Sequence, residues 1–306
     1  MSSASTAPHI AAHIATELHV PEANVLAALG LIAEGNTVPF IARYRKEATG
    51  GLDDTQLRTI EERATYLTEL ADRKQTILAA IEEQGKLTDD LKALILACDT
   101  KARLEDLYLP YKKRRKTKAD AAWEAGLEPL LDRLIAEPHG DPVVAAEAYV
   151  CDGFEDPKKA LDGARAILID RFALDANLVG ELRETMYSTG SMESQVVEGK
   201  EQDGAKFTDY FSFAEPFTSL PSHRILALFR GEKEGVLHLN LNAGDDDHYC
   251  GIIANQFELD TSSSWLADAI RWGWKTKLYI SSGLDIRMRL KEAAEEAALE
   301  VFARNL

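Results

Sequence analysis

Cysteine is scarce in this sequence, and positive charge is scarce relative to negative charge. The 306 residues include three cysteines, Cys98, Cys151 and Cys250, whose separation provides neither a disulfide framework nor a CxxC metal-binding pair. We therefore expect reduced thiols. Lys and Arg number 35 against 51 Asp and Glu, which gives a formal net charge of -16. This charge opposes non-specific binding to phosphates, so any contact with nucleic acid requires a local basic patch.

Long apolar segments are also missing. The first residues, Met1 to Pro8, lack the features of a signal peptide, and no apolar run approaches the length of a membrane-spanning helix. Hydrophobic residues nevertheless make up 45% of the chain and charged residues 28%, as in globular proteins. These features predict a folded, cytoplasmic protein that has no membrane partner.

Apolar residues recur mainly at helical spacing, which predicts a mainly α fold built as a multi-helix scaffold. The longest predicted helix runs from Asp54 to about Gln84, a stretch without Gly or Pro, and would be roughly 45 Å long. Asp53 and Gln56 resemble a capping box at its start. Its apolar stripe is wider than a two-stranded seam, which favours packing within a helical bundle.

The composition changes after Gly190. Residues 196–217 are predicted to be an ordered loop whose aromatic part docks by its rings, and residues 236–242 alternate well enough to predict a minor β element. Trp265, Ala269 and Trp272 fit one face of a helix, where they are expected to anchor a core. These patterns predict an N-terminal helical domain over residues 1–190 and a mixed loop and helix region over residues 191–306. Its last helix reaches Leu306 without a stop signal, so the chain is expected to continue.

The segment from Asn36 to Leu57 predicts a helix-turn-helix-like element that leads into the long helix. Gly35 and Asn36 suit a tight turn, after which Thr37 and Pro39 suit the start of a short helix reaching Glu47. In that helix Phe40, Ile41 and Tyr44 share one side and could be buried, whereas Arg43 and Lys46 lie on another side and could contact phosphates. The alternative is a packing helix with a solvated basic side.

A second candidate site lies in the segment from Leu104 to Lys118. Pro110 stops a helix and leaves Tyr108 and Tyr111 beside six basic residues in seven. Cations with neighbouring aromatic rings can neutralise phosphates and stack on bases. A solvated loop, or an intramolecular partner for acidic helices, explains the segment equally well. The residues predicted to bind nucleic acid are Arg43, Lys46, Tyr108, Tyr111, Lys112, Lys113, Arg114, Arg115, Lys116 and Lys118.

No motif predicts catalysis or a cofactor. His9 and His13 have the spacing of metal ligands but lack a third ligand, and the cluster from Asp245 to Cys250 has no paired second cluster. Gly199 and Lys200 do not form a phosphate loop, because the remaining residues of that motif are absent. We therefore expect no metal, no cofactor and no enzymatic activity.

Three segments together resemble the N-terminal part of the Tex family of bacterial transcription accessory proteins. They are residues 36–58, 104–127 and 199–239, and the terminal stretch from Val301 to Leu306 is similar as well. The resemblance implies that the family's ribonuclease-H-like domain, helix-hairpin-helix elements and OB-fold RNA-binding domain lie outside this chain. It therefore implies that RNA or DNA is bound mainly by domains that are absent here.

The predicted function is that of a non-catalytic helical scaffold of a transcription accessory protein that binds nucleic acid. The alternative is a protein interaction module that docks onto the transcription machinery, with RNA polymerase or another transcription factor as its partner. An enzyme would need convergent carboxylates, histidines or a nucleophile with its base, and the sequence offers none at a recognised spacing.

Overall fold

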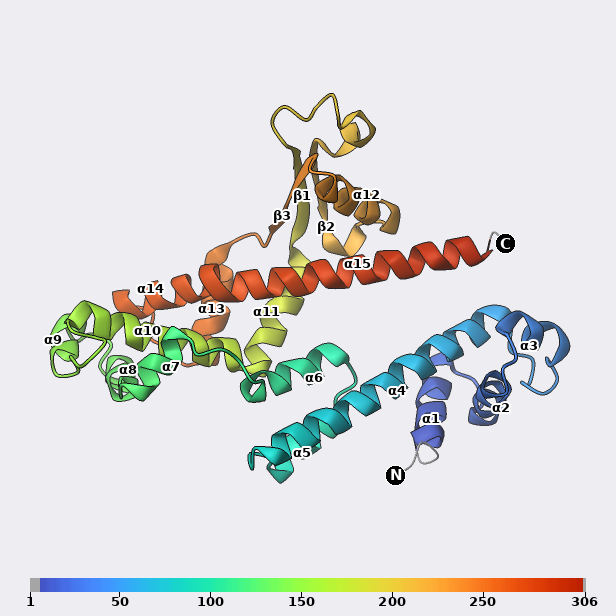
Figure 1. Ribbon diagram of the computed structural model, residues 1–306, viewed down its shortest axis with the longest axis horizontal. Helices are drawn as coiled ribbons and strands as arrows, with labels where there is room; N and C mark the ends of the chain where they lie inside the picture. The colour runs from blue at the N-terminus through green and yellow to red at the C-terminus, as the bar shows by residue number, and fades with distance from the viewer. Residues whose placement is uncertain (1–5, 305–306) are drawn as a thin grey trace. The chain divides into compact units, whose positions relative to one another are not determined.

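The computed structural model describes residues 6–304 of the protein (Figure 1). Residues 1–5, assessed above for a signal peptide, and residues 305–306, the end of the terminal motif, lie outside this range. At 69% helix with one small antiparallel sheet, the structure confirms the mainly α fold. It divides into two compact units, Met1–Tyr111 and Lys112–Leu306. The domain boundary expected after residue 190 stays a prediction.

The first unit is built on one long helix. Its elements are α1 (Thr6–Leu18), α2 (Glu22–Ala33), α3 (Val38–Tyr44), α4 (Asp54–Glu83), α5 (Asp89–Leu96), α6 (Lys101–Tyr108) and the short 3-10 helix η1 (Leu109–Tyr111). The long helix α4 is confirmed, and so is its capping box. Asp53 accepts a hydrogen bond from the backbone N–H of Gln56 at 2.8 Å, and the Gln56 side chain accepts one from the backbone N–H of Asp53 at 3.1 Å.

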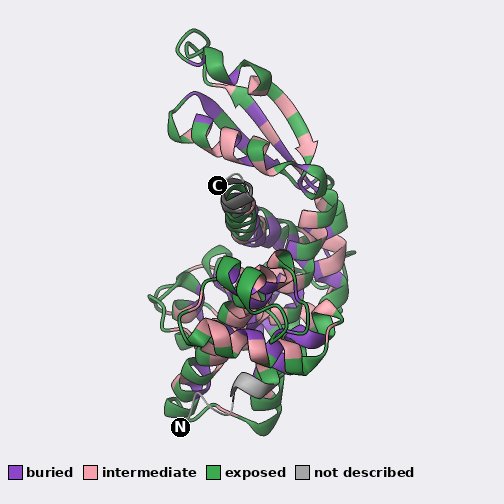
Figure 2. Ribbon diagram, turned by 90° about the vertical axis from the view of Figure 1, so that its right-hand side faces the viewer, coloured by how far each residue is buried: buried purple, intermediate pink, exposed green. Residues whose placement is uncertain are grey.

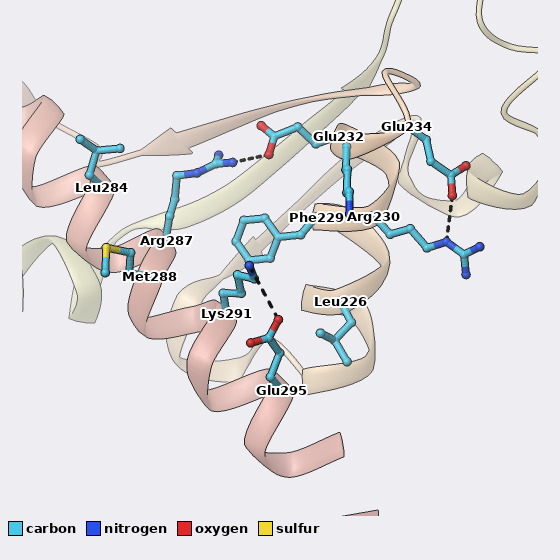
Figure 3. A pocket seen from close by; sticks show the side chains of 11 residues that line it. Leu226, Phe229, Arg230, Glu232, Glu234, Leu284, Arg287, Met288, Lys291 and Glu295 are labelled. Carbon is cyan, nitrogen blue, oxygen red and sulfur yellow. Dashed lines mark hydrogen bonds and ion pairs between the residues drawn. The ribbon is translucent and has the colours of Figure 1, made fainter. Parts of the chain in front are cut away.

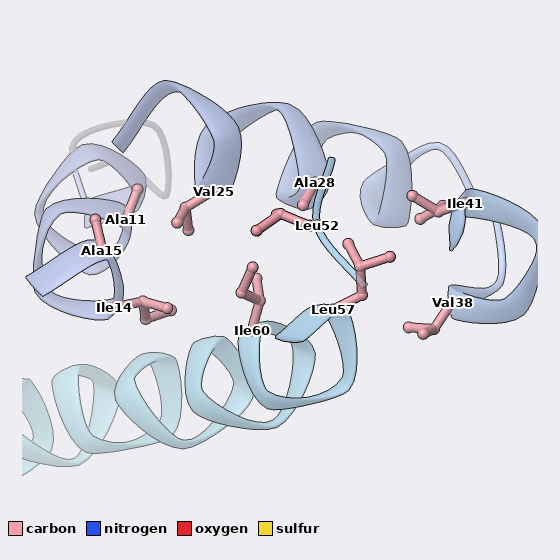
Figure 4. Close-up of a cluster of buried hydrophobic side chains, with 10 residues drawn as sticks. All are labelled: Ala11, Ile14, Ala15, Val25, Ala28, Val38, Ile41, Leu52, Leu57 and Ile60. Atoms are coloured by element: carbon pink, nitrogen blue, oxygen red, sulfur yellow. The ribbon is translucent and has the colours of Figure 1, made fainter. Parts of the chain in front are cut away.

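The core of this unit joins the first three helices to the start of α4 (Figure 4). The buried side chains that form it are Ala11, Ile14, Ala15, Val25, Ala28, Val38, Ile41, Leu52, Leu57 and Ile60. At the surface, the guanidinium of Arg63 on α4 donates to the carboxylate of Glu17 on α1 at 2.7 Å. The bundle packing predicted from the wide stripe of α4 is therefore observed at its N-terminal half.

The second unit is organised around α10 and carries a sheet. Its elements are α7 (Lys118–Glu124), α8 (Glu128–Ala136), α9 (Pro142–Glu147), α10 (Pro157–Leu174), α11 (Ala176–Thr189), β1 (Ser191–Val196), η2 (Ala205–Tyr210), β2 (Ser212–Pro216), η3 (Phe217–Ser219), α12 (Ser222–Lys233), β3 (Leu237–Asn242), α13 (Asp246–Gln256), α14 (Ser264–Gly273), the π-helical turn η4 (Trp274–Leu278) and α15 (Tyr279–Arg304). Through η4, α14 and α15 form one continuous helical stretch. No helix in the described range is both long enough and apolar enough to cross a membrane.

The three strands pair in the order β2-β1-β3, both pairs antiparallel. Buried and exposed residues alternate along β3, so one face of the sheet packs on α12 and the other is open (Figure 2). The strand predicted at residues 236–242 is confirmed. The prediction of a loop over residues 196–217 is wrong in part, because β2 occupies Ser212–Pro216. The aromatic segment does dock by Phe217, which is buried and stacked on Tyr187.

Candidate nucleic-acid interface

The short helix α3 turns its aromatic residues outward. Val38 and Ile41 lie in the core, while Phe40 is 39% and Tyr44 69% exposed. Since successive residues are about 100° apart around a helix, Phe40 and Tyr44 lie on the side opposite Val38. Their ring centroids are 5.2 Å apart. The expectation that this aromatic face is buried is therefore wrong: the aliphatic residues occupy the core, and the rings stay at the surface.

The predicted cations Arg43 and Lys46 lie at the same surface. The helix ends earlier than predicted, since Arg45 leaves helical geometry with φ -126° and ψ 18°, so Lys46 belongs to the turn that follows. Arg43, Arg45 and Lys46 are all exposed, and none of them forms an ion pair with any residue that the structure describes. Sequence reasoning missed Arg45, which sits between two residues that it selected.

The turn that carries these cations is held by hydrogen bonds from a buried residue. The hydroxyl of Thr49, which is fully buried, donates to the backbone carbonyl of Lys46 at 3.2 Å and lies 3.5 Å from that of Arg45. Gly50 follows with φ +66°, and a Cβ there would come within 2.3 Å of the side chain of Asn24 on α2. The turn is therefore closely fitted to its neighbours.

The basic segment from Lys112 to Lys118 is only partly available to a ligand. The guanidinium of Arg114 donates to both carboxylate oxygens of Asp170, at 2.5 and 2.6 Å, and also bonds Asp120 at 3.2 Å. The hydrogen bond to Asp170 raises the pKa of Arg114. Lys116 pairs with Glu124 at 2.7 Å, and its hydrogen bond to that residue raises the pKa of its ammonium group. These two cations are neutralised within the protein.

The remaining cations of the segment differ from those two. Lys113, Arg115 and Lys118 are exposed and make no ion pair within residues 6–304, whereas Lys112 is half-buried and has a partner. Residues 113–117 precede α7 and are not helical. The segment therefore presents three positive charges that have no ion-pair partner among residues 6–304, two on the non-helical stretch and one, Lys118, at the first position of α7. They are the part of the predicted patch that is open to phosphates.

The two tyrosines predicted to assist this segment are partly occupied inside the first unit. The guanidinium carbon of Arg73 on α4 lies 5.6 Å from the centroid of the Tyr108 ring. The backbone carbonyl of Tyr111 accepts a hydrogen bond from the side chain of Gln84 at 3.0 Å. Both residues are half-buried. The Tyr108 ring helps to pack α6 on α4, and the backbone of Tyr111 ties η1 to α4, so neither tyrosine is fully free to stack on bases.

Two of the residues considered for metal binding, His13 and Asp246, have other partners. His13 lies 3.3 Å from the carboxylate of Glu17, which also binds Arg63. Asp246 accepts a hydrogen bond from the indole N–H of Trp274 at 2.7 Å and pairs with Lys275 at 2.9 Å. Among the residues that the structure describes, no three His, Cys, Asp or Glu side chains converge as metal ligands would.

A groove that the sequence analysis missed lies between α12 and α15. It has a volume of about 820 Å³, and its apolar lining includes Leu226 and Phe229 from α12 and Leu284 and Met288 from α15 (Figure 3). The guanidinium of Arg287 bonds the carboxylate of Glu232 and lies over the Phe229 ring, 5.2 Å from its centroid. The four-residue spacing of Leu284 and Met288 within a strong helix former was the available sequence signal.

These features define a class: a mainly helical scaffold protein with small cationic surfaces. Comparison with known proteins gives the family. Residues 8–82 match the Tex-like protein N-terminal domain, and residues 137–302 match the Tex central region-like family. The chain therefore belongs to the Tex family, and the resemblance seen in the sequence is confirmed.

Individual relatives agree with this assignment. The chain is 51% identical over 300 residues to the transcriptional accessory protein Tex of Neisseria gonorrhoeae, and 50% identical over 306 residues to protein YhgF of Escherichia coli K12. Each match covers 96% of this chain and 40% of the relative. The human S1 RNA-binding domain-containing protein 1 is 28% identical over 293 residues, or 90% of this chain and 29% of that protein. The chain thus spans about 40% of the length of its bacterial relatives.

Proposed function

We propose that this chain acts in transcription, in the cytoplasm, as a non-catalytic helical scaffold that contacts nucleic acid. Two relatives support the transcription and nucleic-acid parts of the proposal by their names, a transcriptional accessory protein and an S1 RNA-binding domain-containing protein. Family membership links this chain to them. Since the chain spans 40% of the bacterial relatives, the proposal concerns the contribution of this part of the protein.

One observation carries the proposal: Lys113, Arg115 and Lys118 are exposed and uncompensated, within the described residues, in a chain whose net charge is -16. In such an acidic protein most surface cations have a carboxylate nearby, as Arg114 and Lys116 do. A cation without a carboxylate partner can pair with a phosphate of the nucleic acid and displace the counterion bound there. Because binding then releases counterions, the affinity falls steeply as the salt concentration rises. Lys113 and Arg115 lie in the non-helical segment before α7, and Lys118 is the first residue of that helix, so several such pairings could form along one nucleic-acid backbone.

The test measures binding of the 306-residue chain to a labelled RNA oligonucleotide at low and moderate salt. The triple variant K113Q/R115Q/K118Q should bind more weakly, and the slope of log affinity against log salt should fall by about 0.7 for each cation that paired with a phosphate of the single strand. The matched control K86Q/K158Q/K277Q removes three exposed cations that are dispersed over the chain and form no ion pair within the described range. Equal affinities for the two triple variants would remove this segment from the proposal.

A second candidate function is docking onto a protein of the transcription machinery. The observation that favours it is the outer side of α15, where Ile280, Leu284 and Met288 recur every four residues and are 52%, 58% and 60% exposed. An apolar stripe beside an open groove is typical of a site that accepts a partner helix. Purified bacterial RNA polymerase should bind the chain after nuclease treatment and lose binding to L284E/M288E. Undiminished binding of the variant would exclude this stripe as the docking site.

A further inference from the structure

The exposed residues of α3 and of its following turn form a second, independent surface in the first unit. We call it the α3 surface; it consists of Phe40, Arg43, Tyr44, Arg45 and Lys46. We infer that the α3 surface binds single-stranded nucleic acid, with the two rings stacking on bases and the three cations holding phosphates. This inference rests on the proposed function, since it names the form of nucleic acid and a site for it.

The aromatic pair supplies the first part of the site. Tyr44 is 69% exposed, the largest fraction among the large hydrophobic residues of the described chain that lie at the surface. Exposing a ring to this extent gives up burial that would otherwise stabilise the fold. The Phe40 and Tyr44 rings contact each other at a tilt of 43°, and both residues stay exposed, Phe40 at 39% and Tyr44 at 69%. Open rings of this kind are stacking platforms for unpaired bases.

The cations supply the second part. Arg43, Arg45 and Lys46 lack carboxylate partners among residues 6–304, although Glu and Asp outnumber Lys and Arg by 51 to 35 in the chain. One acidic residue, Glu47, lies in the same turn, so the local balance stays positive. Positive charge next to open rings matches a ligand that has both anionic groups and π-faces. An acidic peptide without aromatic residues offers only the first of these.

The turn is built to hold the cations in place before any ligand arrives. Gly51 N–H donates to the Lys46 carbonyl at 2.9 Å, and the buried Thr49 hydroxyl donates to the same carbonyl at 3.2 Å. Because Val38 and Ile41 lie in the core and Asn24 fits against Gly50, the backbone that carries the rings and the cations is fixed from both ends. A preorganised site loses less conformational entropy on binding.

The geometry favours a single strand over a duplex. In a duplex the bases are already stacked, so the rings of Phe40 and Tyr44 have no base face to cover. A helix that reads a major groove presents amide or guanidinium groups to base edges, whereas the centre of the outward side of α3 is aromatic. The helix is also only seven residues long. Duplex DNA could therefore use the cations of this surface but not its rings.

The test compares a uridine dodecamer with a duplex of equal length, both binding the full 306-residue chain. The variant F40A/Y44A should bind the single strand about tenfold or more weakly and change duplex binding little. The control W272A removes a ring that is 56% exposed in the other unit and should bind as the unaltered chain does. Replacement of Arg43, Arg45 and Lys46 by Gln should lower the salt slope by about 0.7 for each cation.

The conservative variant Y44W gives a direct readout of stacking. All four tryptophans lie in the second unit, so the added indole should give extra fluorescence that the single strand quenches, with affinity retained. If F40A/Y44A binds as tightly as the unaltered chain while K113Q/R115Q/K118Q binds weakly, the inference fails and the proposed function stands. If the chain binds neither the single strand nor the duplex, the inference and the proposed function both fail. A preference for the duplex, or for an acidic peptide over RNA, also overturns the inference.

Discussion

The indole ring of Trp274 lies flat on the ring of Tyr249, with centroids 4.2 Å apart and planes 5° from parallel. Both residues are almost fully buried, at 0% and 1% exposure. The indole N–H donates to Asp246 at 2.7 Å, and the hydroxyl of Tyr249 donates to the carbonyl of Ala243 at 2.9 Å. This stack fixes the π-helical turn between α14 and α15 against α13, and so sets the start of the longest helix of the second unit.

Replacing Trp274 by Phe should destabilise the second unit by about 2 kcal/mol, because the Asp246 carboxylate loses a buried donor while part of the stack remains. Replacing Trp272 by Phe should change the free energy of unfolding by less than about 0.5 kcal/mol, since that ring is 56% exposed. Urea denaturation followed by circular dichroism measures both. Similar costs for the two variants would show that the stack is not a principal anchor.

These two tryptophans also show how far the sequence could predict the core. The size and spacing of Trp265 and Trp272 predicted that both anchor the core. The prediction is wrong for Trp272, which is 56% exposed. The buried face of α14 follows Leu266, Ala269, Ile270 and Gly273, a three- and four-residue pattern of smaller side chains. The buried anchor is Trp274, which begins a π-helical turn. Such a turn contains more residues than an α-helical turn, so a regular helical pattern does not predict it.

The helices were predictable because their signals are local. The capping box predicted at Asp53 forms as expected, and Thr88 and Thr100 cap α5 and α6 by the same local hydrogen bond. Two strands were missed because their pairing is not local: β1 bonds to β3 with Ser194 opposite Leu239, 45 residues later in the chain. The sequence of β1, which begins Ser-Met-Glu, has few of the β-branched and aromatic residues that favour strands.

The candidate site was predictable only in part, for the same reason. The sequence showed that Phe40 and Tyr44 share one side of α3 and that basic residues lie nearby. It could not show which side of α3 would be buried. Val38 and Ile41 form an alternative apolar side, and which side packs into the core depends on contacts with α2 and α4. Likewise, the pairing of Arg114 with Asp170 joins residues 56 positions apart. Charge runs in a sequence therefore overstate the number of cations available to a ligand.

A tight junction between α11 and β1 gives a second stability prediction. At Gly190 a Cβ would lie 2.6 Å from the carbonyl oxygen of Met186 and 2.7 Å from that of Asn242, both in the backbone. G190A should therefore cost about 1–3 kcal/mol. The control G251A lies in α13 with no atom within 4 Å of the added carbon and should stabilise the same unit by about 0.5–1 kcal/mol. Thermal unfolding of the two variants should shift in opposite directions.

The cap positions of α3 and α4 give a third prediction. Asp53 caps α4 through its side chain, whereas Thr37 occupies the cap position of α3 without a side-chain hydrogen bond, contrary to expectation. D53A should lower the free energy of unfolding by about 1 kcal/mol. T37A should change it by less than about 0.5 kcal/mol. A larger effect of T37A than of D53A, measured by urea denaturation, would contradict the cap geometry.

The partners of Asp246 give a pH-dependent prediction. Hydrogen bonds from Lys275 and from the Trp274 indole lower the pKa of Asp246 below its ordinary value of 3.8. A carboxylate whose pKa is lowered by folding stabilises the folded state at any pH above its unfolded value, and this contribution is lost as the pH falls through the folded value. The difference in stability between the unaltered chain and D246N should therefore be constant from neutral pH down to about 5 and shrink below about 4.

The size of this difference is limited by solvent, because the Asp246 side chain is 40% exposed. Screening reduces the pair with Lys275 to about 1 kcal/mol or less. The control D247N removes a carboxylate that is 73% exposed and pairs with Arg271, and should cost less than about 0.5 kcal/mol at neutral pH. Urea titrations at several pH values test both variants. If the loss of stability caused by D246N grew as the pH fell, the fold would favour the protonated form of Asp246. That result would contradict a stabilising ion pair between Asp246 and Lys275.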